Sequence, residues 1–246
     1  GPGVRTHRRL SVMRVHFALV LGVLGLTGCA SAPSMDIAPA TTPDAAGLVD
    51  IRTLVPDIDL DMRYAGSNNF TGAPVVGYAA PRCYLLEPAA KAIQRAEAAL
   101  RTSGYRLRVF DCYRPARAVR AFMEWANDPD ESTKAEFYPA LRKRDLLGGY
   151  ISPTSGHSRG ATVDLTLMRC DASDACAPLD MGTPFDFFDP LANTDSPGAT
   201  PEQRANRERL GEAMRRAGLR NYPMEWWHFT LDPEPAPKQF FDVPIE

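Results

Sequence analysis

The chain has 246 residues, of which 44% are hydrophobic and 24% are charged, as is ordinary for a soluble globular protein of one large or two small domains. Its formal net charge is −2, and removal of the basic N-terminal segment would leave 24 basic and 30 acidic residues, a net charge of −6. This balance argues against a nucleic-acid partner, because binding phosphates needs a basic surface.

Residues 1–28 are typical of a targeting segment. Arginines precede an apolar run at 17–26, which gives way to Leu-Thr-Gly followed by Cys29. The pattern resembles the lipobox of bacterial lipoproteins, which implies cleavage before Cys29, a lipid on its sulfur, and an exported, periplasmic protein that meets the membrane only through that anchor. The alternatives are a plain signal peptide with an incidental cysteine or a short membrane helix, although the run is shorter than the roughly 20 residues that span a bilayer.

Residues 29–47 are rich in Ala, Pro, Thr and Ser, a composition that predicts a flexible tether. We therefore expect a single folded domain over 48–246. No sequence feature indicates a protein partner or an oligomeric state.

Four cysteines remain when Cys29 is set aside. In an exported protein these can oxidise to two disulfides. Cys170 and Cys176 flank a short polar loop and are expected to pair, which leaves Cys83 to pair with Cys112. The alternative is four free, buried thiols.

Periodicity predicts several elements along the chain. Apolar positions at helical spacing predict a helix over 87–103, and Gly104 is placed to end it. Alternation over 106–111 predicts a strand. Proline at a first-turn position predicts a second helix over 115–126.

A third helix is predicted from a capping pattern. Thr200 is followed by proline and by Gln203 at the capping-box position, and an apolar stripe continues to Gly218. Helices and short strands without regular βαβ alternation predict an α+β fold. We expect one domain with a mostly antiparallel central sheet, helices flanking it, and a zinc site on the sheet.

The segment 161–167 alternates between polar and apolar residues, which predicts a strand with Asp164 on its polar face. His157 precedes it in a loop with glycines at 156 and 160, where the backbone can bend a side chain back toward the strand. Taken alone, a histidine and an aspartate at this spacing are a weak signal of a shared metal site. The alternative is a loop histidine whose ring is hydrogen-bonded within the protein, beside a surface aspartate.

The second chemical segment is Glu-Trp-Trp-His at 225–228. His228 opens an alternating stretch that predicts a strand, which would place it on the sheet beside Asp164. His157 and His228 are the histidines outside the predicted leader, and each lies near a carboxylate. Together with Asp164 they offer three ligands to one zinc ion, and Glu225 is left as a base. The alternative for this segment is an aromatic core cluster with a buried-edge histidine.

Arg114 follows the predicted strand 106–111. An arginine there could simply pair with a carboxylate. In a peptidase it could instead stabilise the oxyanion that develops when water attacks a carbonyl.

Several ordered motifs from about Leu54 to the C-terminus resemble the VanX-type D-alanyl-D-alanine dipeptidases, a branch of the zinc D,D-peptidases. They are Asp-Met-Arg-Tyr at 61–64, Asn-Phe-Thr-Gly at 69–72, Tyr-Arg-Pro at 113–115, Gly-Tyr at 149–150, Ser-Gly-His-Ser-Arg-Gly at 155–160 with Asp-Leu-Thr-Leu at 164–167, Met-Gly at 181–182 with Phe-Asp at 185–186, and Glu-Trp-Trp-His at 225–228.

The resemblance implies that His157, Asp164 and His228 ligate one zinc ion per chain, that Glu225 is the general base and later proton donor, and that Arg114 stabilises the tetrahedral intermediate. It also implies that the ends of a small dipeptide substrate are held by Tyr64, Ser155 and Asp186. The alternatives for these three are a core tyrosine, a turn serine and a surface aspartate.

The implied activity is hydrolysis of D-Ala-D-Ala to two D-alanines in peptidoglycan metabolism or recycling. A D,D-carboxypeptidase or endopeptidase acting on peptidoglycan stems is the alternative within the same superfamily. A zinc-binding or peptidoglycan-binding lipoprotein without catalysis is the alternative from another class. Glu225 argues against the last, because a purely structural zinc site needs no spare carboxylate.

Overall fold

The computed structural model describes residues 1, 3 and 35–246. The predicted leader apart from residues 1 and 3, and with it Cys29, lies outside the described residues. Residues 35–246 belong to one compact unit, as expected for a single domain. Within the described part of the chain, no helix has both the length and the apolar character that crossing a membrane requires.

The main sheet has six strands in the order β2-β4-β5-β8-β7, with β6 also paired to β5. Every pairing is antiparallel except that of β2 with β4. A separate antiparallel pair is formed by β1 and β3. The strands are β1 (Leu48–Asp50), β2 (Asp59–Leu60), β3 (Tyr84–Leu86), β4 (Tyr105–Asp111), β5 (Thr162–Cys170), β6 (Cys176–Pro178), β7 (Leu219–Asn221) and β8 (His228–Leu231).

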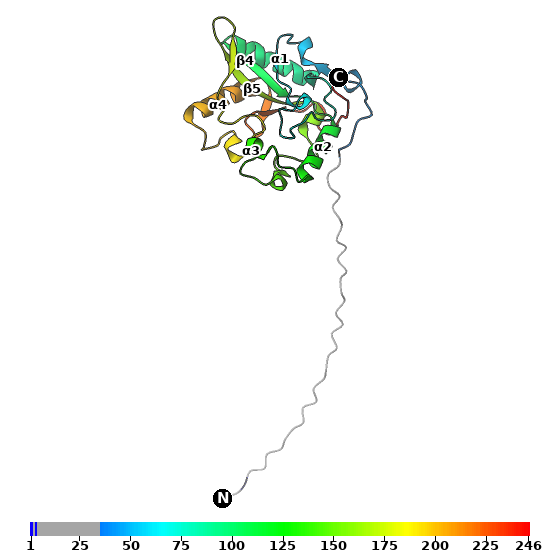
Figure 1. Ribbon diagram of the computed structural model, residues 1–246, viewed down its shortest axis with the longest axis vertical. Helices are drawn as coiled ribbons and strands as arrows, with labels where there is room; N and C mark the ends of the chain where they lie inside the picture. Colours follow the sequence, from blue (N-terminus) through cyan, green and yellow to red (C-terminus); the bar gives the residue numbers. More distant parts are fainter. Residues whose placement is uncertain (2, 4–34) are drawn as a thin grey trace. The chain divides into compact units, whose positions relative to one another are not determined.

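Helices flank this sheet, as predicted for an α+β domain. The α-helices are α1 (Glu87–Arg101), α2 (Ala116–Asn127), α3 (Lys134–Phe137) and α4 (Pro201–Arg216). Helix α1 packs against β4 and α4, and α4 packs against β5 and β7. In Figure 1, α1 lies above β4 and β5, whereas α2 and α3 lie below them. Short 3-10 helices occupy the connections: η1 (Asp44–Ala46), η2 (Ile51–Thr53), η3 (Arg63–Ala65), η4 (Lys143–Leu146), η5 (Gly156–Arg159) and η6 (Pro190–Ala192).

The local signals explain where the long helices begin and end. Thr200 and Gln203 form the predicted reciprocal capping box of α4. Helix α1 ends two residues before Ser103, and Gly104 follows with a φ of 74°, which is why a glycine suits that turn. The predicted strand at 106–111 and helix at 115–126 correspond to β4 and α2.

Strand β5 departs from the predicted pattern because both of its faces are buried. Thr162, Asp164 and Thr166, expected on a polar face, are only 0%, 2% and 3% exposed. The Thr162 hydroxyl is satisfied by the Thr230 hydroxyl of β8 at 2.9 Å. Alternation marked the two faces correctly but could not show that side chains from other segments cover the polar one. Asp164 therefore lies in a dry environment.

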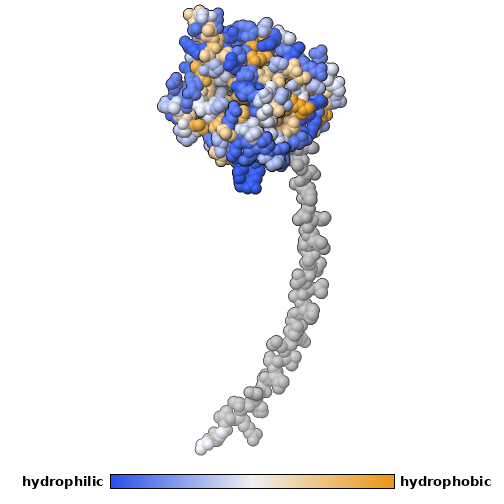
Figure 2. Space-filling view, viewed as in Figure 1, coloured by the Kyte–Doolittle hydropathy of each residue, from blue (hydrophilic) through white to orange (hydrophobic). Residues whose placement is uncertain are grey.

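A second packed region lies beneath α2 and is aromatic. The ring of Phe122 lies 5.0 Å from that of Tyr64 and 4.8 Å from that of Phe70, between ring centroids. On the face drawn in Figure 2, hydrophobic residues of the domain are scattered among hydrophilic ones. The large hydrophobic side chains that are exposed in the described part are Ile37 and Val76. The apolar residues of this region are thus gathered inside the domain.

Both predicted disulfides are present. Cys83 is bonded to Cys112, and Cys170 is bonded to Cys176. The second bridge joins the end of β5 to the start of β6 and closes the polar loop between them. The alternative of four free thiols is therefore wrong.

The described part of the predicted tether, residues 35–47, contacts the domain. The Ala38 amide donates to the carbonyl of Phe240 at 2.8 Å, Ile37 forms a bridge with Phe240, and Ala46 is buried. The composition of this segment is that of a linker, but its partners lie some two hundred residues further along the chain, where a local pattern cannot reveal them. The packed structure thus begins before the expected boundary at Leu48.

Candidate metal centre

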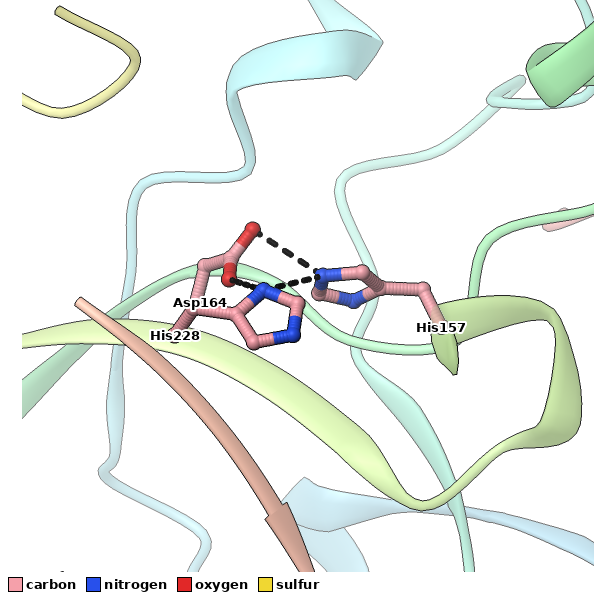
Figure 3. A group of neighbouring side chains, drawn as sticks. All are labelled: His157, Asp164 and His228. Atoms are coloured by element: carbon pink, nitrogen blue, oxygen red, sulfur yellow. Dashed lines mark hydrogen bonds and ion pairs between the residues drawn. The ribbon is translucent and has the colours of Figure 1, made fainter. Parts of the chain in front are cut away.

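Three side chains from three elements meet at one point. His157 lies on η5, Asp164 on β5 and His228 at the start of β8, and Figure 3 shows both rings turned toward the carboxylate. Asp164 and His228 are direct partners in the ladder between β5 and β8. The prediction that His228 lies beside Asp164 on the sheet is therefore confirmed.

The turn that carries His157 is fixed by its own sequence. Ser155 caps η5 by accepting a hydrogen bond from the His157 amide at 3.2 Å. Gly160 ends η5 with a φ of 77°, and a Cβ at this position would come within 2.9 Å of the Leu48 side chain. A glycine is thus required for both conformation and space, and it lets the chain turn directly into β5.

The ring orientation of His157 is set by a backbone carbonyl. Its Nδ1 lies 2.8 Å from the carbonyl oxygen of Cys112. A carbonyl can only accept, so Nδ1 carries the proton and Nε2 presents a lone pair. Histidine ligands of metals are commonly oriented by such a bond from their other ring nitrogen.

The donor atoms have the separations that a metal ion needs. Nε2 of His157 lies 3.3 Å from Nδ1 of His228 and 3.2 Å from Oδ2 of Asp164, and Nδ1 of His228 lies 3.0 Å from Oδ1 of Asp164. Tetrahedral zinc with ligands at about 2.0–2.2 Å implies about 3.3–3.5 Å between ligand atoms. Oδ1 of Asp164 is buried and accepts no hydrogen bond. The three side chains therefore fit a small divalent cation.

Charge in the site also favours a cation. Burial alone would raise the pKa of the Asp164 carboxyl, but the neighbouring His157 holds that pKa well below its usual range. Asp164, Asp186 and Glu225 line the same cavity, together with the single guanidinium of Arg114. These three buried carboxyl groups share the cavity with one guanidinium and two imidazoles, and a divalent ion bound by the imidazoles would supply positive charge to the site.

Glu225 lies beside the three ligands without joining them. Its Oε2 is 3.4 Å from Nδ1 of His228, and the residue is 8% exposed. Burial raises the pKa of Glu225 to about 7. A carboxyl with such a pKa can both take up and release a proton near neutral pH.

Arg114 pairs with a carboxylate, the first of the two roles weighed from the sequence, and it lies where the second role would require it. Its guanidinium pairs with Asp111 at 2.9 Å, and it also lines the cavity, with one nitrogen 3.8 Å from Oδ2 of Asp164. Asp111 is fully buried and accepts a further hydrogen bond from the Tyr78 hydroxyl at 2.8 Å. We did not single out Asp111 from the sequence, although its position three residues before an arginine at a strand end was a signal for such a pair.

The cavity above the ligands is small, at about 230 Å³, compared with roughly 300–1,000 Å³ for pockets that hold drug-sized ligands. Its apolar walls include Phe70, Phe122 and Phe188. Trp226 and Trp227, which lie between Glu225 and His228 in the sequence, do not line the cavity. They lie in the core, where the Trp226 indole donates to the Thr183 hydroxyl at 2.8 Å. The sequence pattern around residues 225–228 did not show which aromatic side chains would line the cavity above the metal-ligand residues.

The three residues expected to hold a substrate all line this cavity. The Tyr64 hydroxyl donates to Oδ2 of Asp186 at 2.7 Å. Burial raises the pKa of Asp186 well above its usual range, and its φ of 58° is rare for a residue with a side chain. Ser155 accepts a long hydrogen bond of 3.5 Å from Arg114. Tyr64 and Asp186 are therefore buried polar groups of the site, neither a surface aspartate nor an isolated core tyrosine.

A buried arginine secures the loop that carries Asp186. The guanidinium of Arg207, on α4, donates to the carbonyls of Met181, Leu191 and Asn193 at 2.7–2.9 Å. Arg207 is 2% exposed, and no carboxylate of the described residues lies within 4 Å of it. Both ends of the loop 181–193 are thus bonded to one side chain of the helix.

A family model described as D-ala-D-ala dipeptidase, of peptidase family M15, matches residues 44–246. The chain belongs to this family. M15 peptidases of this group are zinc metallopeptidases, and the site formed by His157, Asp164 and His228 is the group of side chains that could hold such an ion in the described part of this chain.

Individual relatives agree with the family assignment. The D-alanyl-D-alanine dipeptidase of Enterococcus faecium is 37% identical over 81% of this chain and 98% of its own length. That of Streptomyces coelicolor is 40% identical over 78% of this chain and 95% of its own. Among solved structures, the LdcB LD-carboxypeptidase aligns with a TM-score of 0.38 and 16% identity over 78% of this chain and 71% of that chain, and we base no conclusion on so distant a similarity.

We predict that the M15 domain loses its metal when either histidine is removed. His157→Ala and His228→Ala each leave two ligands, which do not hold zinc tightly. The measurement is zinc content per chain by plasma mass spectrometry after gel filtration. Glu225→Gln is the matched control, because it changes a neighbouring side chain that is not among the three donors, and it should keep its zinc. Full zinc content in either histidine variant would contradict this ligand assignment.

Proposed function

We propose that this M15 protein is a zinc-dependent D-alanyl-D-alanine dipeptidase that hydrolyses D-Ala-D-Ala to two D-alanines in cell-wall metabolism. The observation that carries the proposal is the placement of Glu225 beside three metal-ligand side chains in a partly open cavity of about 230 Å³. The cavity is small enough to favour a dipeptide over a peptidoglycan stem. The dipeptidases of E. faecium and S. coelicolor, aligned over nearly their full lengths, support the same activity.

One zinc ion per chain would be held by His157, Asp164 and His228. When bound, it would act as a Lewis acid toward the peptide carbonyl. The chain's own residues then have two tasks, which are to move a proton and to stabilise developing negative charge.

Glu225 performs the proton transfers. Its carboxylate takes a proton from the attacking water and passes it to the nitrogen of the departing amine, so that the peptide C–N bond breaks and two D-alanines leave. The raised pKa of Glu225, about 7, suits both transfers near neutral pH. Burial of the residue keeps competing bulk water away from the proton.

Arg114 stabilises the oxyanion. Asp111 fixes its guanidinium through two short contacts, so the positive charge is already in place at the cavity wall before the reaction begins. A fixed charge in a dry site is worth several kcal/mol to a developing negative charge, because no reorganisation is needed when the charge forms.

The ends of the dipeptide have complementary groups in the cavity. Asp186 is buried, and no basic side chain among residues 35–246 forms an ion pair with it, so a substrate ammonium group would supply the positive charge, with Tyr64 orienting the carboxylate. Ser155 offers a hydroxyl on the side of the cavity where Arg114 lies. We therefore propose Tyr64, Asp186 and Ser155 as substrate-binding residues.

We also propose that the protein is exported and anchored at the periplasmic side of a membrane by a lipid on Cys29. The two disulfides support export, since such bonds persist mainly in oxidising compartments. An exported dipeptidase would meet D-Ala-D-Ala as released wall material, which favours recycling or scavenging over depletion of a cytoplasmic precursor.

The substrate prediction separates a dipeptidase from a carboxypeptidase. We expect D-alanine to be released from free D-Ala-D-Ala much faster than from a pentapeptide stem that ends in D-Ala-D-Ala, because a cavity of about 230 Å³ accommodates a dipeptide more readily than a longer peptide. The measurement is kcat/KM for each substrate, with D-alanine detected by a coupled oxidase. Faster release from the pentapeptide would replace the proposal with a D,D-carboxypeptidase, and release from neither would leave a binding protein.

The role of Glu225 gives a second prediction. Glu225→Gln should keep bound zinc while kcat falls by about 10² to 10⁴, the range ascribed to general acid-base catalysis. Glu208→Gln, which changes an exposed carboxylate on α4, is the matched control and should retain wild-type kcat. Near wild-type turnover by Glu225→Gln would show that another group moves the proton.

The anchor is tested on the full chain expressed in a bacterium. We expect the wild type to incorporate a labelled fatty acid and to partition into detergent, whereas Cys29→Ala should do neither. The matched control is the double variant Cys170→Ala/Cys176→Ala, which also removes thiols but should keep the label. A label that survives Cys29→Ala would place the lipid elsewhere, and an unlabelled wild type would refute the anchor.

A further inference from the structure

The disulfide between Cys83 and Cys112 lies next to the metal centre but outside the cavity. It joins the residue before β3 to the residue after β4, and its Cα atoms are 5.2 Å apart. Cys83 is 1% and Cys112 0% exposed, and neither lines the cavity. The bridge therefore cannot act on a substrate directly.

Cys112 contacts a proposed zinc ligand through its backbone. The Nδ1–H of His157 donates to the Cys112 carbonyl at 2.8 Å, and two residues later the Arg114 amide donates to the His157 carbonyl at 3.3 Å. The segment 112–114 and His157 are thus bonded to each other in both directions. Any shift of the Cys112 carbonyl would turn the His157 ring or break its only oriented bond to the backbone.

The sheet alone holds this segment weakly. The register between β4 and β5 shifts between Val109 and Asp111, and the regular ladder of β4 ends at Asp111. Beyond it, the Tyr113 amide donates to the Tyr84 carbonyl at 2.9 Å. The disulfide reinforces this bond, because it ties Cys112 to the residue that precedes Tyr84 in the chain. The Tyr113 hydroxyl also holds the segment, since it exchanges hydrogen bonds with the Val243 backbone at 2.7 and 3.0 Å, but the bridge is the bond made by Cys112 itself.

We infer that the Cys83–Cys112 disulfide is a positioning element for the metal centre, which fixes the Cys112 carbonyl and through it the orientation of His157. The inference rests on the proposed ligand role of His157. The partners that orient metal-bound histidines typically affect metal affinity by about 10- to 100-fold. Zinc affinity should therefore depend on the oxidation state of these two buried cysteines.

The test compares two variants, each of which lacks one of the two disulfides. Cys83→Ala/Cys112→Ala should bind zinc at least about tenfold more weakly than the wild type, in competition with a chromogenic chelator. The control is Cys170→Ala/Cys176→Ala, whose bridge lies roughly 20 Å from Asp164 along the extended strand β5. The control should keep wild-type zinc affinity even though its unfolding midpoint falls.

A spectroscopic readout accompanies the affinity. In the metal-free wild type, the Nδ1–H of His157 should give a slowly exchanging proton signal in ¹H–¹⁵N spectra, and this signal should broaden or vanish only in Cys83→Ala/Cys112→Ala. A disulfide that served stability alone would lower the unfolding midpoint without changing either readout, and that result would overturn the inference. Equal losses of affinity in both double variants would also overturn it.

A second comparison tests the inference if the variant Cys83→Ala/Cys112→Ala does not fold. Wild type and Cys170→Ala/Cys176→Ala are treated with a trialkylphosphine, which breaks the S–S bond, yields two thiols with protons from water, and takes the water oxygen as phosphine oxide. Under conditions that preserve the far-ultraviolet circular dichroism, both should lose zinc affinity on reduction, and unchanged affinity refutes the inference. Because zinc is measured without substrate, failure to hydrolyse D-Ala-D-Ala would refute the proposed activity and leave this result unaffected.

Discussion

The antiparallel ladder between β5 and β8 is the constraint on which the site depends. It places Asp164 directly opposite His228, and on the same face Thr162 lies opposite Thr230 with their hydroxyls bonded. Phe229 points to the other face and is 1% exposed, so its burial resists any slip. A shift of one residue would turn this phenylalanine toward the metal centre and move His228 away from Asp164 at the same time. Hydrophobic burial on one face of the sheet thus enforces the geometry of charged groups on the other.

The same burial raises the free-energy cost of the charged groups in the site. Asp111, Asp164, Asp186 and Glu225 are all at most 8% exposed, and ionised carboxylates in such an environment are costly unless a positive charge lies nearby. Arg114 meets that need for Asp111. Asp164 lies between the two imidazoles of the metal centre, and burial raises the pKa of Asp186 and Glu225, so that a bound metal ion or a substrate ammonium group would favour their ionised forms. The affinity of the site for a metal ion and for a substrate ammonium group thus depends on the apolar surroundings as much as on the carboxylates.

Local patterns predicted the parts of this structure that local physics determines. The capping box at Thr200, the helix ending near Gly104 and the alternation around Asp164 each correspond to an observed element. The metal-ligand set was found because few histidines occur in the chain. What the sequence could not show depends on contacts between distant segments, such as the packing of Ala38 on the C-terminal region, the burial of both faces of β5 and the choice of phenylalanines as cavity walls. Asp111 was missed although Arg114 lies three residues away, because its burial and its bond with Tyr78, 33 residues earlier in the chain, have no local signal.

The bonding of Arg207 has a consequence for how the cavity can open. Swinging the loop 181–193 outward would strip a buried guanidinium of three acceptors at once, which makes that motion expensive. Residues 148–152 also line the cavity, but their backbone hydrogen bonds are local, from Gly148 to Ile151 and from Ile151 to Leu146, and Gly148 and Gly149 are exposed. Substrate and product would therefore enter and leave the cavity past residues 148–152, while the loop 181–193, which carries Asp186, stays in place.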